Sequence, residues 1–273
     1  MSEKFEIVDA HQHVGSLADA LSFSGRPVGE DLPVEQDAAQ RIRAMDAAGV
    51  DWAVLQPSHG YVKAAGLRDT MRVNDRMAAY KCFAPERFRV VLGTVEPMHG
   101  EASLPETDRC KHELGLDGIA WHHRFQGCYI DSRWMWPILE RMQALAMVPL
   151  VHVNVESSLE AHWRLQRLAR DFPDMGFLAM DGLWSYERAR HVLHTASLTP
   201  NVIWDLGGPA IYVSIEEWVE RNGSGTICFS ADIGYGGEGQ RPKLLDAVER
   251  ARIQDRDREN ILGGNICRLF GSS

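Results

Sequence analysis

Residues 148–182, VPLVHVNVESSLEAHWRLQRLARDFPDMGFLAMDG, carry a strand pattern, a helix pattern and a second strand pattern in close succession. The outer parts, Val148–Asn154 and Gly176–Gly182, are short apolar runs of the kind found in strands buried on both faces. Between them, Ser158–Asp171 is amphipathic and rich in helix-forming residues. This order is typical of two parallel strands joined by a crossover helix.

The same alternation extends over the whole chain in both directions. Six further apolar runs predict strands at Phe5–Val14, Trp52–Pro57, Phe88–Pro97, Asp117–His123, Asn201–Gly208 and Thr226–Ile233. The segments with helical patterns are Gln36–Ala48, Arg68–Phe83, Trp134–Ala146, Ser185–Ala196, Ile215–Arg221 and Lys243–Ile253, with a weaker pattern at Glu106–Leu114. Eight repeats predict an α/β fold of the (β/α)8 (TIM) barrel type. The alternative, an open doubly wound sheet, would need an early GxGxxG loop, which is absent.

The length of 273 residues allows one large domain or two small ones. There is no low-complexity tract and no linker between the repeats. The glycine-rich segment Gly234–Gly239 directly follows the eighth predicted strand, where a barrel places a loop over its active face. We therefore expect a single barrel domain over residues 1–273.

The composition excludes several classes of protein. Hydrophobic residues make up 45% and charged residues 25%, as in ordinary globular domains. No apolar run is long enough to cross a membrane and the chain starts without a signal segment, so we expect a cytoplasmic protein. Five scattered cysteines without a CxxC pair fit reduced thiols. The net charge of −9 and the absence of a basic block argue against nucleic acid as a partner.

Histidines and a carboxylate stand at the ends of three predicted strands. His11 and His13 are two residues apart in the first strand, so their side chains share one face. His152 ends the fifth strand and Asp232 ends the eighth. The carboxyl ends of barrel strands meet at one rim, so these residues predict a divalent-metal site. The alternative is that the histidines are ordinary buried polar groups and Asp232 caps a helix.

With these residues in place, the sequence resembles the amidohydrolase superfamily, in its amidohydrolase-related branch of metal-dependent hydrolases and decarboxylases. The segments that carry the resemblance are DAHQHVG (9–15), VLQPS (54–58), VNDRMAAYKCFAPERF (73–88), VHVN (151–154), NVIWDLGG (201–208), SAD (230–232) and ILGGNICRLF (261–270). The resemblance implies a distorted (β/α)8 barrel that holds one divalent metal ion, zinc first and manganese as the alternative. It implies His11, His13, His152 and Asp232 as the ligands, a metal-bound water as nucleophile, and Asp232 as the group that moves its proton.

Two departures from the family pattern bear on the site. Many members carry a histidine at the end of the sixth strand, where this chain has Asp181; we expect either a catalytic role or a helix cap there. Two-metal members place a lysine at the fourth strand, which here ends in His122 and His123 without one. This favours a single metal ion. Adjacent strand residues face opposite ways, so one of the two histidines should face the pocket, and we expect His123, as a catalytic residue.

Further residues near the predicted rim are candidates for substrate binding. They are Gln56 and His59 after the second strand, His122 and Arg124 after the fourth, and Tyr235 after the eighth. A planar guanidinium such as that of Arg124 pairs well with a carboxylate. Simple packing or exposure is the alternative for each.

We expect, first, a hydrolase that acts with metal-activated water on a small carboxylated or cyclic substrate, such as a lactone or an amide. The alternative is a metal-dependent, non-oxidative decarboxylase of an aromatic or unsaturated acid. Hydrolysis is ranked first because Asp181 replaces the histidine of the decarboxylases. A third hypothesis is a barrel that binds metal or ligand without catalysis. A small-molecule substrate is the expected partner, and the family suggests a homo-oligomer.

Overall fold

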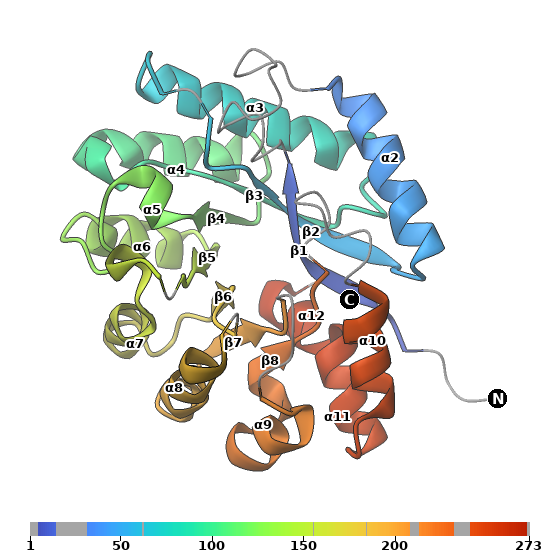
Figure 1. Ribbon diagram of the computed structural model, residues 1–273. Helices are drawn as coiled ribbons and strands as arrows, with labels where there is room; N and C mark the ends of the chain where they lie inside the picture. The colour runs from blue at the N-terminus through green and yellow to red at the C-terminus, as the bar shows by residue number, and fades with distance from the viewer. Residues whose placement is uncertain are drawn as a thin grey trace.

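The computed structural model describes residues 5–14, 32–61, 63–154, 156–183, 185–207, 213–231 and 241–271. In this part of the chain, eight parallel strands lie side by side in chain order and are surrounded by helices (Figure 1). The strands are β1 (Val8–Val14), β2 (Trp52–Pro57), β3 (Val90–Gly93), β4 (Gly118–Trp121), β5 (Val148–His152), β6 (Phe177–Met180), β7 (Val202–Asp205) and β8 (Ile227–Cys228). The predicted (β/α)8 barrel is confirmed, with every strand inside its expected segment.

Helices follow the strands, and all of them except α5, α11 and α12 overlap a segment with a predicted helical pattern. They are α2 (Val34–Ala47), α3 (Leu67–Phe83), α4 (Ser103–His112), α5 (His123–Gln126), α6 (Met135–Ala144), α7 (His162–Asp171), α8 (Tyr186–Ser197), α9 (Ile215–Asn222), α10 (Arg241–Arg250), α11 (Asp255–Glu259) and α12 (Asn265–Phe270). Short 3-10 turns lie at Pro97–Ala102, Ser158–Glu160 and Ser224–Thr226, and a π-helical turn at Asn260–Gly264 leads into α12. None of the helices in the described ranges is both long and apolar enough to span a membrane.

The barrel is closed between its first and last strands by a few polar contacts. The backbone N–H of Ala10 donates to the carbonyl of Phe229, at 3.2 Å. The N–H of Ala231 donates to the Asp9 carboxylate, at 2.7 Å. β8 is only two residues long, so this side-chain contact takes over where the regular ladder ends.

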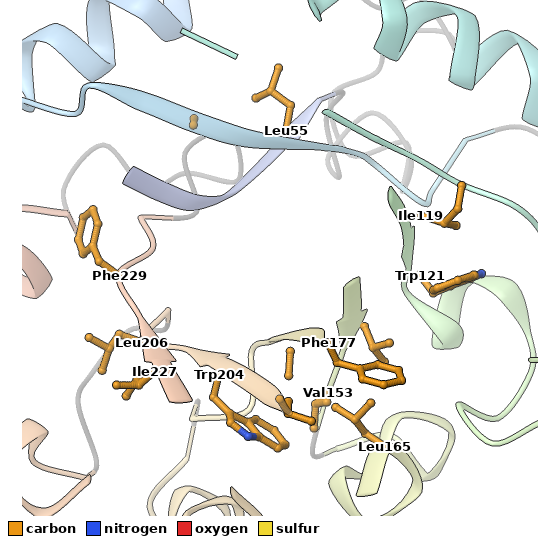
Figure 2. Packing of buried hydrophobic residues seen from close by; sticks show 14 of the residues in the cluster. Leu55, Ile119, Trp121, Val153, Leu165, Phe177, Trp204, Leu206, Ile227 and Phe229 are labelled. Atoms are coloured by element: carbon orange, nitrogen blue, oxygen red, sulfur yellow. The ribbon is translucent and has the colours of Figure 1, made fainter. Parts of the chain in front are cut away.

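Alternate side chains of the strands face two different cores. The inner core is formed by Val8, Ala10, Trp52, Val54, Val90, Leu92, Ala120, Leu150, Leu178, Met180 and Cys228, together with Ile266 of α12. The outer core packs the other strand faces against the helices, as Trp204, Phe177 and Leu165 of α7 show (Figure 2). Because both strand faces are covered, the strands are apolar throughout, which is why their sequence pattern is clear.

A β-bulge in β1 decides where the paired histidines point. Asp9 pairs with Ala53 and Gln12 with Leu55, so β1 has one residue more than β2 over this stretch. Beyond the bulge, His13 lies opposite Gln56, on the interior side that Trp52 and Val54 share. The extra residue therefore moves the histidines to the inside of the barrel at its carboxyl end.

Candidate metal centre and active site

Three histidines from β1 and β5 converge inside the carboxyl end of the barrel. Nε2 of His11 lies 2.9 Å from Nε2 of His13, which lies 3.2 Å from Nε2 of His152. In each ring the other nitrogen already contacts an oxygen. Nδ1 of His11 lies 3.1 Å from the Asp205 carboxylate, Nδ1 of His13 lies 3.3 Å from the Pro57 carbonyl, and Nδ1 of His152 lies 2.8 Å from the Trp121 carbonyl.

These contacts fix the protons of the rings. A carbonyl or carboxylate oxygen only accepts hydrogen bonds, so each Nδ1 carries the proton and each Nε2 presents a lone pair. Burial and the neighbouring histidines hold the pKa values of His13 and His152 well below their ordinary range. Additional protons on these rings therefore do not relieve the repulsion between the converging lone pairs. Three converging lone pairs in a buried site suit a divalent cation, and the site therefore fits a metal ion.

Asp205 at the end of β7 supports this cluster and was missed by the sequence analysis. One of its carboxylate oxygens contacts His11 and accepts a hydrogen bond from the Ser230 hydroxyl at 2.9 Å. Its other oxygen accepts the backbone N–H of Asp181, also at 2.9 Å. A carboxylate behind a metal-binding histidine orients the ring and raises its basicity. The signal was available, because Asp205 ends the seventh strand in the quoted segment NVIWDLGG.

Asp181 follows β6 and its backbone has a φ of 65°, in the left-handed region that aspartate tolerates better than most residues. A carboxylate oxygen of Asp181 lies 4.0 Å from Nδ1 of His11. Helix α8 is preceded by Ser185 at its N-cap, so the helix-capping alternative for Asp181 is wrong. The structure thus brings Asp181 to the edge of the histidine cluster.

The structure places His122 and His123 opposite to our expectation. The imidazole of His122 stacks on that of His152, with ring centroids 4.3 Å apart and an angle of 3°. His123 begins α5 and stacks instead on Trp121 of the outer core, and neither of its buried nitrogens has a partner. The physical reason is strand parity: Ala120 faces the inner core and Trp121 the outer core, so His122 points inward and His123 points away from the site.

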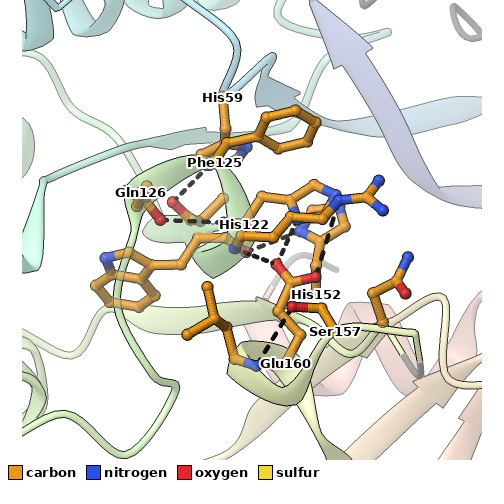
Figure 3. A network of polar contacts seen from close by, with 12 residues as sticks. His59, His122, Phe125, Gln126, His152, Ser157 and Glu160 are labelled. Atoms are coloured by element: carbon orange, nitrogen blue, oxygen red, sulfur yellow. Dashed lines mark hydrogen bonds and ion pairs between the residues drawn. The ribbon is translucent and has the colours of Figure 1, made fainter.

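Glu160 is a second functional candidate that the sequence analysis missed. It lies in the short turn Ser158–Glu160 after β5 and is completely buried. Its carboxylate lies 2.5 Å from Nδ1 of His122 and accepts the backbone N–H of Arg124 at 2.9 Å (Figure 3). Burial raises the pKa of Glu160 to about 8, whereas burial and neighbouring histidines lower that of His122. A glutamate in a loop pattern gives no periodic signal, so only the folded chain reveals this pair.

The residues after β2 place polar atoms beside the cluster. Nε2 of His59 donates to the Ala120 carbonyl at 2.9 Å, which leaves Nδ1 as a buried lone pair without a partner. The His59 ring centroid is 5.7 Å from that of His152. Gln56 is fully buried and neither end of its amide has a partner. Burial lowers the pKa of His59 to about 3, which favours the neutral imidazole.

Of the three remaining candidate residues, one lies at the rim of the site and two lie outside the described residues. Arg124 is partly exposed, with its guanidinium 5.0 Å from the ring centroid of Phe125 and 4.0 Å from the outer oxygen of Glu160. Asp232 and Tyr235 lie outside the described residues, so their roles stay predictions.

A barrel that gathers histidines at the carboxyl ends of its strands defines the class of metal-dependent (β/α)8 enzymes. The family model described as amidohydrolase matches residues 8–272 of this chain, which therefore belongs to the amidohydrolase family. No curated protein matches the chain. The chain is thus an enzyme of this metal-dependent family.

Solved structures share the fold over their full length. The 5-carboxyvanillate decarboxylase LigW from Sphingomonas paucimobilis has a TM-score of 0.75 at 16% identity, and the match covers 99% of this chain and 100% of that one. A 5-carboxyvanillate decarboxylase from Novosphingobium aromaticivorans, complexed with manganese and 4-hydroxy-3-methoxy-5-nitrobenzoic acid, has a TM-score of 0.76 at 17% identity, covering 99% and 97%. The 2,6-dihydroxybenzoate decarboxylase from Rhizobium has a TM-score of 0.72 at 16% identity, covering 98% and 99%. At these identities the likeness establishes the fold.

Proposed function

We propose that the protein is a metal-dependent decarboxylase that removes CO2 from a small aromatic carboxylic acid without an oxidant. The observation that carries the proposal is the set of three converging Nε2 lone pairs on His11, His13 and His152. The similarity to three decarboxylases of substituted benzoic acids, over almost the whole chain, supports this choice of chemistry. This proposal reverses the ranking expected from the sequence, which placed hydrolysis before decarboxylation.

In this proposal His11, His13 and His152 hold the metal ion, with Asp232 as the expected fourth ligand. When bound, the ion supplies positive charge to the carboxylate and to a neighbouring oxygen of the substrate. Manganese in one neighbour and zinc from the sequence expectation are the two ions to test. Asp232 is proposed to deliver the proton that replaces CO2 on the ring.

The other residues of the chain position the substrate. The neutral amide of Gln56 and the Nδ1 lone pair of His59 offer hydrogen bonds from the β2 side. Arg124 at the rim offers a planar cation for a second anionic group. The strands that carry these residues are packed against the helices by the outer core, and a site built on packed strand ends can position substrate groups precisely.

The product decides between the two chemistries. Protein reconstituted with Mn²⁺ or Zn²⁺ is given hydroxybenzoates labelled with carbon-13 in the carboxyl group, and separately lactones and amides in oxygen-18 water. We expect labelled CO2 from an aromatic acid, lost in His13→Ala and retained in His162→Gln, a buried histidine on α7 that contacts Thr195. Incorporation of oxygen-18 into a lactone or amide, with no CO2 from any acid, would overturn the proposal.

Hydrolysis remains the second candidate because of Asp181. This carboxylate stands where the sequence pattern of many relatives has a histidine, and it lies 4.0 Å from His11. A carboxylate there can take a proton from an attacking water, as hydrolysis requires. Asp181→Asn tests this role: a hydrolase in which Asp181 takes the proton should lose most of its turnover, whereas the proposed decarboxylase keeps its proton donor, Asp232, and should lose substrate affinity but keep its turnover at saturating substrate.

A further inference from the structure

We propose that Glu160 is a positioning residue that determines substrate specificity by fixing the tautomer of His122. In that tautomer, His122 and Asp181 form a subsite that only accepts hydrogen bonds. The subsite therefore selects a substrate group that donates a hydrogen bond, such as a hydroxyl or an amino group. This inference rests on the proposed function, because it concerns the acid bound at the same centre. Its residues directly follow β4 (His122) and β6 (Asp181) or lie in the turn after β5 (Glu160), beside the three histidines proposed to bind the metal ion.

The hydrogen bonds of Glu160 settle which ring nitrogen of His122 carries the proton. One carboxylate oxygen, Oε1, takes both the backbone N–H of Arg124 at 2.9 Å and Nδ1 of His122 at 2.5 Å. The other oxygen, Oε2, is buried without a hydrogen-bond partner among the described residues, and Nε of Arg124 lies 4.0 Å from it. An oxygen that accepts two N–H groups is the carbonyl-like or anionic one, so any carboxyl proton sits on Oε2. In both charge states, therefore, Nδ1 of His122 donates to Glu160.

The position of Glu160 is itself held by the backbone. The N–H of Glu160 donates to the Ser157 carbonyl at 3.1 Å, and the hydroxyl of Ser157 accepts the N–H of Leu159 at 3.3 Å. The carbonyl of Leu159 accepts the N–H of Ile130 at 3.0 Å, which ties the turn to the segment after α5. Figure 3 shows Glu160 below His122, between this turn and the ring stack. The carboxylate thus serves as a fixed acceptor.

With Nδ1 engaged, the other nitrogen of His122 presents a lone pair. Its ring lies parallel to that of His152, one stacking distance away from the metal centre. A ring nitrogen of His122, one of His152 and a carboxylate oxygen of Asp181 lie within 4.8 Å of one another. The Nε2 of His152 is directed to the metal centre, which leaves two acceptors, the imidazole lone pair of His122 and the carboxylate of Asp181. A substrate group that donates hydrogen bonds suits this pair, and an ether oxygen or a fluorine is repelled.

The test measures ligand preference in metal-reconstituted protein. Dissociation constants for salicylate, ortho-aminobenzoate and ortho-fluorobenzoate are determined by calorimetry, because fluorine resembles a hydroxyl in size but cannot donate. We expect the wild type to bind both donor ligands at least about tenfold more tightly than the fluoro ligand, the factor that one hydrogen bond to a charged group commonly gives. Direct chelation of the metal by the ligand contributes equally in all variants. It therefore cancels when the ratio of the dissociation constants of fluoro and donor ligands is compared between each variant and the wild type.

Three variants distinguish the effect of the His122 tautomer on ligand preference from the effects of the Glu160 charge and of ring packing. Glu160→Gln keeps an oxygen for Nδ1 and should keep the preference within about threefold, whereas Glu160→Leu should lower it about tenfold. His122→Phe retains a ring stacked on His152 without any acceptor and should also lose the preference, which covers the case of a Glu160→Leu protein that does not fold. His162→Phe, which removes a buried histidine outside the site, is the control and should retain it.

An unchanged preference in His122→Phe and in folded Glu160→Leu would overturn the inference. So would a second bound metal equivalent that His122→Phe abolishes, because the acceptor pair would then hold a cation. Release of CO2 is recorded separately. Its absence would count against the proposed function and would leave the binding preference readable.

Discussion

Nε2 of His11 lies 2.9 Å from Nε2 of His13, although each ring has already committed Nδ1 to an oxygen of another residue. In the neutral tautomers that these oxygens select, neither Nε2 carries a proton, and the contact brings two lone pairs close together. A buried pair of this kind is costly unless a positive charge stands between the nitrogens. His152 adds a third lone pair from the opposite side. The centre is therefore arranged for a cation before any substrate arrives.

The first prediction concerns metal content. Protein purified without chelators should carry about one equivalent of divalent metal per chain, as a site with three histidine ligands and a carboxylate would. His13→Ala should lose most of it, and chelation should lower the thermal unfolding temperature of the wild type and of His162→Ala but not that of His13→Ala. Elemental analysis and thermal unfolding measure both. Metal-free wild-type protein that does not respond to added Zn²⁺ or Mn²⁺ would contradict the site, and His162→Ala serves as the control.

The second prediction concerns the support of the centre by Asp205. Asp205→Asn removes the negative charge behind His11 and lets an amide N–H point at Nδ1, which favours the wrong tautomer. We expect metal affinity to fall about 10- to 100-fold, measured by competition with a chromophoric chelator. Asp131→Asn is the matched control, since Asp131 pairs with Arg164 and Arg167 away from the site. Equal affinity in the two variants would show that Asp205 has no such role.

The barrel could be predicted from the sequence because the same alternation of strand and helix patterns recurs eight times. Strands buried on both faces are apolar throughout, and helices such as Leu67–Phe83 show their own period between them. Helix α12 was not predicted, because Asn265–Phe270 follows a π-helical turn and places Ile266 in the inner core, an arrangement with no regular pattern.

The site could be predicted only where its residues follow regular strand ends. His11 and His13 were expected to share a face, and they do, yet their inward direction depends on a β-bulge that no sequence pattern shows. His122 and His123 could not be told apart, because Ala120 and Trp121 are both apolar and leave the phase of β4 open. Glu160 comes from an irregular turn and is recognised only by its contact with His122.

The third prediction tests the close approach of two strands. A Cβ added at Gly118 would lie 2.1 Å from the carbonyl oxygen of Val148, on the neighbouring strand β5. Gly118→Ala must therefore push β4 and β5 apart, and we expect a loss of about 1–3 kcal/mol in the free energy of unfolding. Gly225→Ala, where an added Cβ meets nothing within 4 Å, should change it by less than about 0.5 kcal/mol. Urea unfolding measures both, and similar stabilities would argue against this packing.

The fourth prediction follows from the titration of Glu160. Burial raises its pKa in the folded protein to about 8, from an ordinary value of about 4.5. Between these values the folded state keeps a proton that the unfolded state has lost, so the free energy of unfolding falls as the pH rises. The contribution is fully present below about pH 4.5 and is lost as the pH rises through about 8.

Glu160→Gln removes this titration and keeps the shape of the side chain. From pH 5 to pH 8, the wild type should lose at least about 1 kcal/mol of unfolding free energy relative to Glu160→Gln, since one pKa unit corresponds to about 1.4 kcal/mol. Urea unfolding of both proteins across this range measures the difference. The other titrating groups, including the histidines, are common to both proteins, so their contributions cancel. Parallel curves would mean that Glu160 is ionised in the folded protein, held as a carboxylate by His122 and Arg124.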